Sequence, residues 1–362
     1  MKLVLTAGGT GGHIFPALAV LDAVLAREPA TEVRFFGPDN RGERRMVESR
    51  GIPFEAVSAA GIRGRGPLQL ARSLWRVIAG TFAAARKLRA FHTDVVFSTG
   101  GYASFPASLA ARLLRRPLVV YLPDVAPGWA VRAEQRLATR MATTTEAALA
   151  HLPPNKTTVT GYPVRAEFFN LTREEARARL GIDPSTRVVL VAGASQGARA
   201  INRAVFDNIR QLATEATVIH ITGEADAGEA TTLKKSLEGS LVARYLTASF
   251  RDDMPIAMLA ADVAVMRAGA SILGELPAAG LPAILVPGTF AGGHQRDNAR
   301  WLADAGAAVV IEETEIETLP GALLGLLADR ARLETMRAAA QALARPRAAS
   351  DIAAIICEVA NR

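Results

Sequence analysis

The residue best suited to move a proton in this chain is a histidine at the end of a glycine-rich run. His13 directly follows Gly-Gly-Thr-Gly-Gly over residues 8–12, and an apolar run over 3–6 precedes the glycines. An imidazole titrates near neutral pH, so it can take the proton of an attacking hydroxyl group. A histidine that only caps a helix or packs against it is the alternative. The run has neither the lysine of a nucleoside-triphosphatase loop nor dinucleotide-binding spacing.

A second glycine-rich loop repeats this plan about 180 residues further along the chain. An apolar run over residues 188–192 predicts a buried strand, and Gly-Ala-Ser-Gln-Gly over 193–197 leads into a predicted helix. N–H groups at a helix start attract anions, so such a junction suits phosphate. Ser195 and Gln196 are therefore candidate ligands of a diphosphate, and Arg165 can add a positive charge there.

Polar side chains near later strands can hold a sugar. Glu275 lies near the start of a predicted helix, where a carboxylate can accept hydrogen bonds from both hydroxyls of a ribose. A favourable charge at a positive helix start is the alternative explanation. Gln295 and Asn298 follow a strand predicted over 283–286, and their amides suit sugar hydroxyl groups. No histidine or cysteine cluster has metal-ligand spacing, so we expect neither a catalytic metal nor a cofactor.

Between residues 61 and 91, a basic loop is followed by a predicted helix with apolar side chains at a spacing of four. The apolar positions are Leu70, Leu74, Ile78 and Phe82, with Trp75 beside them. The cationic residues that flank them are Arg72, Arg76, Arg86, Lys87 and Arg89. A basic amphipathic helix with an aromatic side chain can lie on an anionic membrane. Burial of the stripe in a core is the more frequent explanation.

The bulk composition bounds the number of domains and the class of partner. Half of the 362 residues are apolar, and this length favours two domains, each with its own core. A single cysteine, Cys357, excludes a disulfide framework. Residues 1–160 carry a net charge of +10 and the remainder −3, which favours an anionic partner such as nucleic acid or a membrane surface. A solvated arginine-rich surface with no such partner is the alternative.

Apolar runs alternate with helical stretches in both halves, which predicts parallel sheets covered by helices on both faces. The strands predicted in the first half are 3–6, 32–36, 95–98, 118–121 and 157–160. Those predicted in the second half are 188–192, 217–221, 263–266, 283–286 and 308–311. We therefore expect an α/β protein with two Rossmann-like domains, residues 1–163 and 164–344, facing each other across a cleft. A helix over 345–362 is expected to pack back on the first domain.

The motifs of this chain, in their order, resemble those of the MurG family of peptidoglycan N-acetylglucosaminyltransferases over nearly the whole length. They are residues 8–13, 100–102 (Gly-Gly-Tyr), 195–198 (Ser-Gln-Gly-Ala), 250–254 (Phe-Arg-Asp-Asp-Met), 267–275 and 294–299. The resemblance implies a GT-B glycosyltransferase fold. It also implies inverting, metal-independent transfer of N-acetylglucosamine from UDP-N-acetylglucosamine to the muramyl 4-hydroxyl of undecaprenyl-linked lipid I, giving lipid II. The implied location is peripheral, on the cytoplasmic face of the bacterial cell membrane.

The resemblance also implies which residues form the acceptor side. His13 would be the base. The residues implied to lie near the sugar or the acceptor are Thr10, Gly11, Gly12, Gly100, Gly101 and Tyr102. The helix with Leu74, Trp75, Ile78 and Phe82 corresponds to the membrane-associating region of the family, which favours an anionic membrane over nucleic acid as the partner.

For the donor nucleotide, the resemblance implies that Ser195 contacts the diphosphate and that Arg165 lies near the donor. Phe250 and the backbone at Arg251 would hold the uracil. The residues implied to surround the nucleotide are Ala270, Ser271, Ile272, Leu273, Gly274 and Glu275. Within this set Glu275 would bind the ribose, and Gln295 would bind the hydroxyl groups of N-acetylglucosamine.

Two segments depart from the family pattern. Where the family has His-Glu-Gln-Asn, this chain has Tyr121-Leu122-Pro123-Asp124, and the usual Gly-Asn-Pro is Gly161-Tyr162-Pro163. Asp124 can still accept a hydroxyl hydrogen bond, and its carboxylate can share the work of general base with His13. The alternatives are a related UDP-sugar transferase with a different lipid or cell-envelope acceptor, a non-catalytic nucleotide-sugar-binding scaffold and, last, a nucleic-acid-binding protein.

Overall fold

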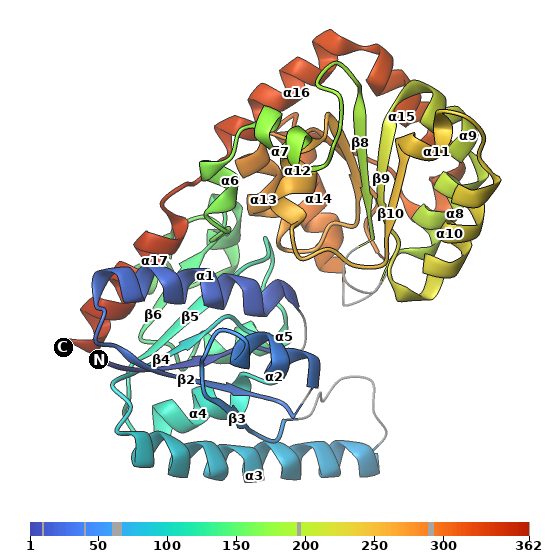
Figure 1. Ribbon diagram of the computed structural model, residues 1–362. Helices are drawn as coiled ribbons and strands as arrows, with labels where there is room; N and C mark the ends of the chain where they lie inside the picture. The colour runs from blue at the N-terminus through green and yellow to red at the C-terminus, as the bar shows by residue number, and fades with distance from the viewer. Residues whose placement is uncertain (9–10, 40, 60–66, 194–196, 289–292, 362) are drawn as a thin grey trace. The chain divides into compact units, whose positions relative to one another are not determined.

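The computed structural model describes residues 1–8, 11–39, 41–59, 67–193, 197–288 and 293–361. The predicted site residues Thr10, Ser195 and Gln196 lie outside the described residues. The chain divides into two compact units (Figure 1). Unit 1 comprises Met1–Val164 and Arg347–Arg362, and unit 2 comprises Arg165–Pro346.

Unit 1 contains a parallel sheet in which seven described strands follow the order β3-β2-β1-β4-β5-β6-β7. The strands are β1 (Lys2–Thr6), β2 (Glu32–Gly37), β3 (Phe54–Ala56), β4 (Val95–Ser98), β5 (Leu118–Leu122), β6 (Arg140–Thr143) and β7 (Thr157–Val159). Every residue of β4 and β5 is buried. Strands of this kind are apolar throughout because both of their faces are covered.

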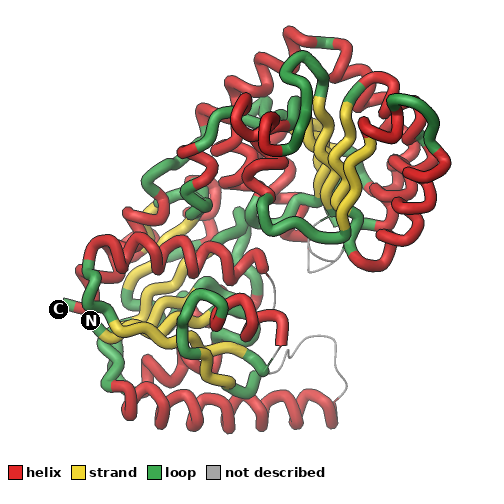
Figure 2. Tube along the Cα trace, in the orientation of Figure 1, coloured by secondary structure: helices red, strands yellow, loops and turns green. Residues whose placement is uncertain are grey.

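Helices cover both faces of this sheet (Figures 1 and 2). The helix α1 (Gly11–Arg27) packs against α17 (Ala348–Ala360) on one face, and α3 (Pro67–Phe91) packs against α4 (Phe105–Leu113) on the other. The other helical segments of unit 1 are α2 (Arg41–Glu48), α5 (Trp129–Glu134) and the 3-10 helices η1 (Glu146–His151) and η2 (Pro154–Lys156). The C-terminal helix therefore belongs to the core of unit 1.

Unit 2 repeats the architecture with six described strands in the order β10-β9-β8-β11-β12-β13. The strands are β8 (Val188–Ala192), β9 (Thr217–Ile221), β10 (Tyr245–Ala248), β11 (Val263–Met266), β12 (Ala283–Leu285) and β13 (Ala308–Val310). The helices are α6 (Glu167–Asn170), α7 (Arg173–Arg179), α8 (Arg199–Asp207), α9 (Ile209–Glu215), α10 (Ala227–Ser236), α11 (Leu241–Arg244), α12 (Met254–Ala260), α13 (Ile272–Ala279), α14 (His294–Asp304), α15 (Leu319–Ala328) and α16 (Arg330–Ala342), with 3-10 turns η3 (Glu224–Asp226) and η5 (Glu313–Thr318).

The predicted α/β class with two parallel sheets is confirmed. Three strands, β3, β6 and β10, were absent from the prediction. The strands β3 and β10 lie at sheet edges and are only partly buried, while β6 (Arg-Met-Ala-Thr) has no apolar run that reveals it. None of the helices in the described part of the chain is both long and apolar enough to cross a bilayer.

A glycine inside α3 permits the close packing of that helix in unit 1. A Cβ atom at Gly80 would lie only 1.9 Å from the carbonyl oxygen of Ser58 and 3.4 Å from the Cβ of Pro106 at the start of α4. Glycine weakens a helix by about 1 kcal/mol relative to alanine. The contact with the Ser58 carbonyl therefore explains why glycine occupies this position.

We expect Gly80→Ala to lower the free energy of unfolding by about 1–3 kcal/mol, because the methyl group displaces α3 from the Ser58 carbonyl. Gly228→Ala is the matched control, since Gly228 also lies within a helix, α10, and a Cβ atom there would meet open space within 4 Å. The control should be neutral or stabilising by up to about 1 kcal/mol. Urea unfolding of both variants measures this, and equal shifts would contradict the explanation.

Candidate active site

His13 lies at the start of α1, partly buried, where the chain leaves the first glycine loop. Its Nδ1 is 2.9 Å from the carbonyl oxygen of Thr99, and the Thr99 hydroxyl donates to the His13 carbonyl at 2.7 Å. A carbonyl oxygen only accepts hydrogen bonds, so Nδ1 carries the proton in the neutral imidazole. This leaves the lone pair on Nε2, which is the form of histidine that acts as a general base.

The two glycine loops of unit 1 meet backbone to backbone. A Cβ atom on Gly8 would lie 2.8 Å from the Cα and carbonyl carbon of Gly101, and one on Gly101 would lie 2.7 Å from the Cα and oxygen of Gly8. Gly100 and Gly101 also have φ values of 82° and 91°, which favour glycine. The structure thus brings the predicted acceptor residues 100–102 beside the first glycine loop, with the Tyr102 side chain exposed.

The two departures from the family pattern contact each other. Tyr121, at 0 % exposure on β5, has its hydroxyl 2.7 Å from the Thr144 hydroxyl and 3.2 Å from the Gly161 carbonyl oxygen. Its ring lies edge-on to that of Tyr162, with 6.3 Å between centroids. The Tyr162 hydroxyl donates to the Gly12 carbonyl at 3.1 Å, so this tyrosine pair supports the backbone next to His13.

Asp124 lies partly buried, two residues beyond the end of β5. The pKa of Tyr121 is raised well above its ordinary value, mainly by burial and in part by the negative charge of Asp124. Leu122, like Tyr121, is buried. Asp124 is therefore the residue of the 121–124 segment that combines a polar side chain with partial exposure.

A buried carboxyl group that sequence reasoning missed lies beneath the 100–102 loop. Glu134, the last residue of α5, has no exposed surface. Three serine hydroxyls lie within hydrogen-bond distance of it, at 2.7–3.1 Å, and we call this set the serine cage: Ser98, Ser104 and Ser108. Burial raises the pKa of Glu134 to about 7, although the three serine hydrogen bonds oppose that shift.

In unit 2, the predicted uracil-binding segment is ordered by arginines. Arg251 holds Asp253 through two hydrogen bonds of 2.8 and 2.6 Å, which lower the pKa of that carboxyl group. The Arg165 side chain donates to the carbonyl of Asp252 at 2.6 Å. Phe250 is half exposed, as a side chain available for a ligand must be.

The predicted ribose ligand lies at the start of α13. Glu275 is partly buried in the first turn of this helix. Burial raises its pKa, while a hydrogen bond with Ser271 and the positive charge of Arg165 oppose that shift. Arg165 therefore acts on both the 250–253 segment and Glu275, which brings the two predicted donor-binding segments into one electrostatic neighbourhood within unit 2. Ala270 and Ser271 are partly buried there, and Ile272, Leu273 and Gly274 are buried.

The amides after β12 hold loops of unit 2 in this structure. The Oε1 of Gln295 accepts a hydrogen bond from the Gly288 backbone at 2.7 Å. The Nδ2 of Asn298 donates to the Ala268 carbonyl at 3.1 Å, and this side chain is fully buried. Contact of Gln295 with a sugar through its amide N–H groups stays a prediction, and Asn298 supports the loop that precedes α13.

A second network missed from the sequence lies beside the loop that follows β8. His220 is buried in β9, with Nδ1 3.0 Å from the Tyr245 hydroxyl and Nε2 3.0 Å from Oδ1 of Asn202. Burial lowers the pKa of His220 to about 3, so it is neutral. Asn202 also donates to the Thr222 carbonyl, which a Cβ on Gly197 would approach within 2.4 Å. In the sequence, a histidine inside the otherwise apolar strand predicted over 217–221 could have indicated this network.

The described residues contain no cluster of three or more histidine, cysteine, aspartate or glutamate side chains arranged to hold a metal ion.

Comparison with known proteins assigns both units to one family. Residues 3–143 match the glycosyltransferase family 28 N-terminal domain, and 188–352 match its C-terminal domain. The chain is 38% identical, over 100% of its length and 99% of the relative's, to the UDP-N-acetylglucosamine–N-acetylmuramyl-(pentapeptide) pyrophosphoryl-undecaprenol N-acetylglucosamine transferase of Desulforudis audaxviator. It is 36% identical, over 100% and 97%, to the transferase of the same name from Symbiobacterium thermophilum. The crystal structure of Acinetobacter baumannii MurG superposes with a TM-score of 0.75 at 26% identity, covering 99% of each chain.

The Glu134 carboxyl group should make the stability of unit 1 depend on pH. Its pKa is about 7 in the folded chain against an ordinary value of 4.5, so the folded state binds the proton more tightly. The stabilisation is complete below pH 4.5 and is lost as the pH rises through 7, by up to about 3 kcal/mol. Urea unfolding between about pH 5 and 8 should show this loss in the wild type.

Glu134→Gln should lack this component, because an amide does not titrate. The difference between the two curves isolates Glu134 from His220, which titrates in the opposite sense. A difference that is constant across the pH range would contradict the assigned ionisation.

Proposed function

Since this chain belongs to the MurG family of glycosyltransferases, we propose that it joins N-acetylglucosamine from UDP-N-acetylglucosamine to the muramyl 4-hydroxyl of lipid I, forming lipid II. The GT-B fold of its two parallel α/β units and the identity over the full chain support this reaction. The observation that carries the chemistry is the His13–Thr99 hydrogen bond, because in the neutral imidazole it places the proton on Nδ1 and the lone pair on Nε2.

In the proposed mechanism, the oxygen of the muramyl 4-hydroxyl attacks C1 of the donor N-acetylglucosamine. At the same time, Nε2 of His13 takes the proton of this hydroxyl. The bond between C1 and the diphosphate oxygen breaks, and UDP departs with the electron pair. Direct displacement inverts the configuration at C1. We propose that the starts of α8 and α13, together with Arg165 and the 195–196 segment, stabilise the negative charge on UDP, so that no metal or cofactor is needed.

On the donor side, Glu275 would accept hydrogen bonds from the ribose hydroxyls. Phe250 and the Arg251 backbone would hold the uracil, and the N–H groups of Gln295 would bind the sugar. The charge of Arg165 near Glu275 supports this grouping, since it suits a nucleoside diphosphate that brings hydroxyls and phosphates together. Asn298 would act by supporting the loop between β11 and α13.

On the acceptor side, the segments 121–124 and 161–163 differ from the motifs expected from the resemblance, and their tyrosines lie in the interior of unit 1. Tyr121 and Leu122 are buried, so neither presents a polar group to an acceptor. The acceptor would instead contact residues 10–13, residues 100–102 and Asp124. We assign the base to His13 and a hydroxyl-binding role to Asp124.

We expect His13→Ala to lower kcat by about 10²–10⁴-fold, because the attacking hydroxyl then loses its general base. The assay offers a purified lipid I analogue with UDP-N-acetylglucosamine and measures the disaccharide product. Asp124→Asn should lower kcat by less than tenfold. A wild-type chain that binds the donor without forming the disaccharide would contradict lipid I as the acceptor.

Glu275→Ala is the control that separates binding from chemistry. Its loss of ribose hydrogen bonds should raise the KM for UDP-N-acetylglucosamine about tenfold, with a smaller effect on kcat. Unchanged turnover across donor concentrations would contradict the ribose assignment.

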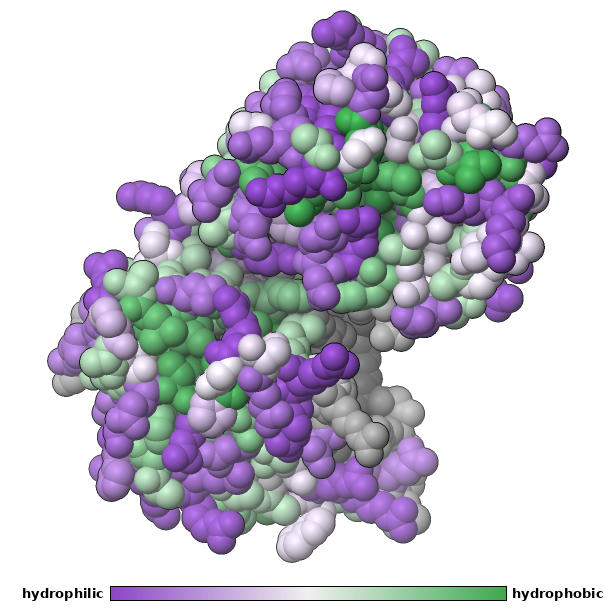
Figure 3. All heavy atoms as spheres, viewed as in Figure 1, coloured by the Kyte–Doolittle hydropathy of each residue, from purple (hydrophilic) through white to green (hydrophobic). Residues whose placement is uncertain are grey.

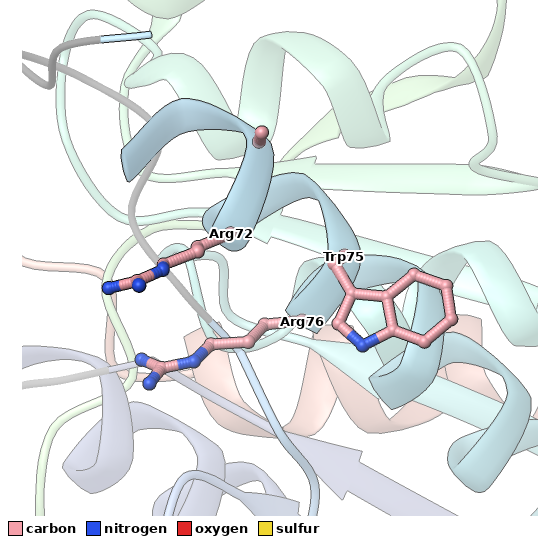
Figure 4. Close-up of a pocket in the computed structure, with 4 residues that line it drawn as sticks. Arg72, Trp75 and Arg76 are labelled. Atoms are coloured by element: carbon pink, nitrogen blue, oxygen red, sulfur yellow. The ribbon is translucent and has the colours of Figure 1, made fainter. Parts of the chain in front are cut away.

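We also propose that α3 binds an anionic membrane surface, where the lipid acceptor resides. Among the described side chains of α3, the large apolar residues Leu74, Trp75, Ile78 and Phe82 are exposed, with Trp75 at 70% and Phe82 at 72% exposure. Arginines accompany them: Arg72 and Arg76 extend from one side of α3 and Trp75 from the other, around a surface hollow (Figure 4). Hydrophilic and paler, more apolar side chains alternate along the edge of unit 1 where α3 lies (Figure 3). This pattern suits headgroups and acyl chains together.

Trp75→Glu combined with Phe82→Glu should abolish binding to vesicles that contain anionic phospholipid, because two charges replace the apolar contacts. Co-sedimentation with vesicles measures the bound fraction. Phe169→Glu is the control, since Phe169 is 43% exposed on α6 of unit 2. Equal loss in both variants, or none in either, would contradict a membrane-binding role for α3.

A further inference from the structure

The serine cage around Glu134 is bonded directly to the turn of the second glycine loop of unit 1. The Ser98 hydroxyl donates to Glu134 and accepts a hydrogen bond of 3.1 Å from the Gly100 backbone. The Ser104 hydroxyl lies 2.8 Å from Glu134 and 2.7 Å from the Gly101 carbonyl oxygen. The carboxyl group is therefore linked through a single serine side chain to each glycine of the turn.

The same short segment holds His13. Thr99 stands between Ser98 and Gly100, and its carbonyl accepts the hydrogen bond from Nδ1 of His13. Its hydroxyl donates to the His13 backbone. A displacement of the 98–101 segment therefore moves both partners of the histidine. It also moves Gly101, which packs against Gly8.

The Glu134 carboxyl group competes with the turn for the single hydrogen of the Ser104 hydroxyl. The Ser104 hydroxyl has one hydrogen but two acceptors within 2.8 Å, Glu134 and the Gly101 carbonyl. The charge state and position of Glu134 thus decide how strongly Ser104 binds the turn. Ser108, by contrast, donates to Glu134 at 2.7 Å and lies on α4, with no hydrogen bond to residues 99–101 among those described.

We propose that Glu134 is a positioning residue for the transfer reaction, which through Ser98 and Ser104 fixes the Gly100–Gly101 turn and thereby the His13 imidazole. Its catalytic consequence rests on the proposed function. Burial of a carboxyl group does not by itself stabilise a fold, because burial disfavours the charged form of the group. Its three serine partners and their bonds to the turn supply a reason for its presence beneath the loop.

The test measures kcat and donor KM for Glu134→Gln, which keeps the side-chain volume but replaces one acceptor oxygen by a donor group. We expect kcat to fall at least fivefold while the donor KM stays within twofold, since the proposed donor residues lie in unit 2. Ser104→Ala should lower kcat in the same way, and Ser108→Ala should have a clearly smaller effect. Full kcat in folded Glu134→Gln, or equal losses in the two serine variants, would overturn the proposal. If Glu134→Gln does not fold, the serine pair decides.

A second readout does not depend on transferase activity. The chain has five histidines, so the imidazole resonances of isotope-labelled protein can be assigned to His13 by their absence in His13→Ala. These resonances should shift in Glu134→Gln and Ser104→Ala, and much less in Ser108→Ala. Equal shifts, or none, would overturn the positioning role even if no disaccharide forms. If the resonances shift as expected but the wild type forms no disaccharide, the positioning role is supported and the proposed function is refuted.

Discussion

The approach of Gly8 to Gly101 is the contact on which the acceptor half of the site depends. The strands β1 and β4 are neighbours in a parallel sheet, so their carboxyl ends emerge side by side, and the loops that follow must share one small space. A Cβ atom on either glycine would lie within 2.8 Å of the other loop's backbone. Only glycine permits this, and the approach places Thr99 where it can bind both the His13 backbone and its imidazole.

Buried polar networks contact or lie close to the described glycines Gly12, Gly100, Gly101 and Gly197 of the two units. In unit 1 the serine cage binds the Gly100–Gly101 turn, and the Tyr121–Tyr162 pair binds the Gly12 carbonyl. In unit 2 the neutral His220 joins Tyr245 to Asn202, which holds the carbonyl of Thr222 beneath Gly197. A glycine has no side chain to order its backbone, so hydrogen bonds from neighbouring groups help to fix these described positions.

The tyrosine pair joins the 121–124 and 161–163 segments, which differ from the motifs expected from the resemblance. Tyr121 and Tyr162 are 41 positions apart in the sequence, yet their rings contact each other and their hydroxyls bind Gly161 and Gly12. Changes in two motifs thus form one packed unit in the interior. Within the 121–124 segment, Asp124 is the residue whose polar side chain is partly exposed.

The α/β class, the strands and helices that flank the two glycine loops, and the family could all be predicted from the amino-acid order, because they depend on local periodicity and on residue types at fixed spacing. The role of His13 stays a prediction. The amino-acid order did not reveal β3, β6 and β10, whose short mixed segments become strands only through pairing with a neighbour. Tertiary structure alone decided that Glu134 lies among three serines from β4, the loop after it and α4, and which ring nitrogen of His13 carries the proton. It also shows that Leu74, Ile78 and Phe82 of α3 are exposed. Such facts depend on contacts between distant segments, and sequence periodicity describes only one segment at a time.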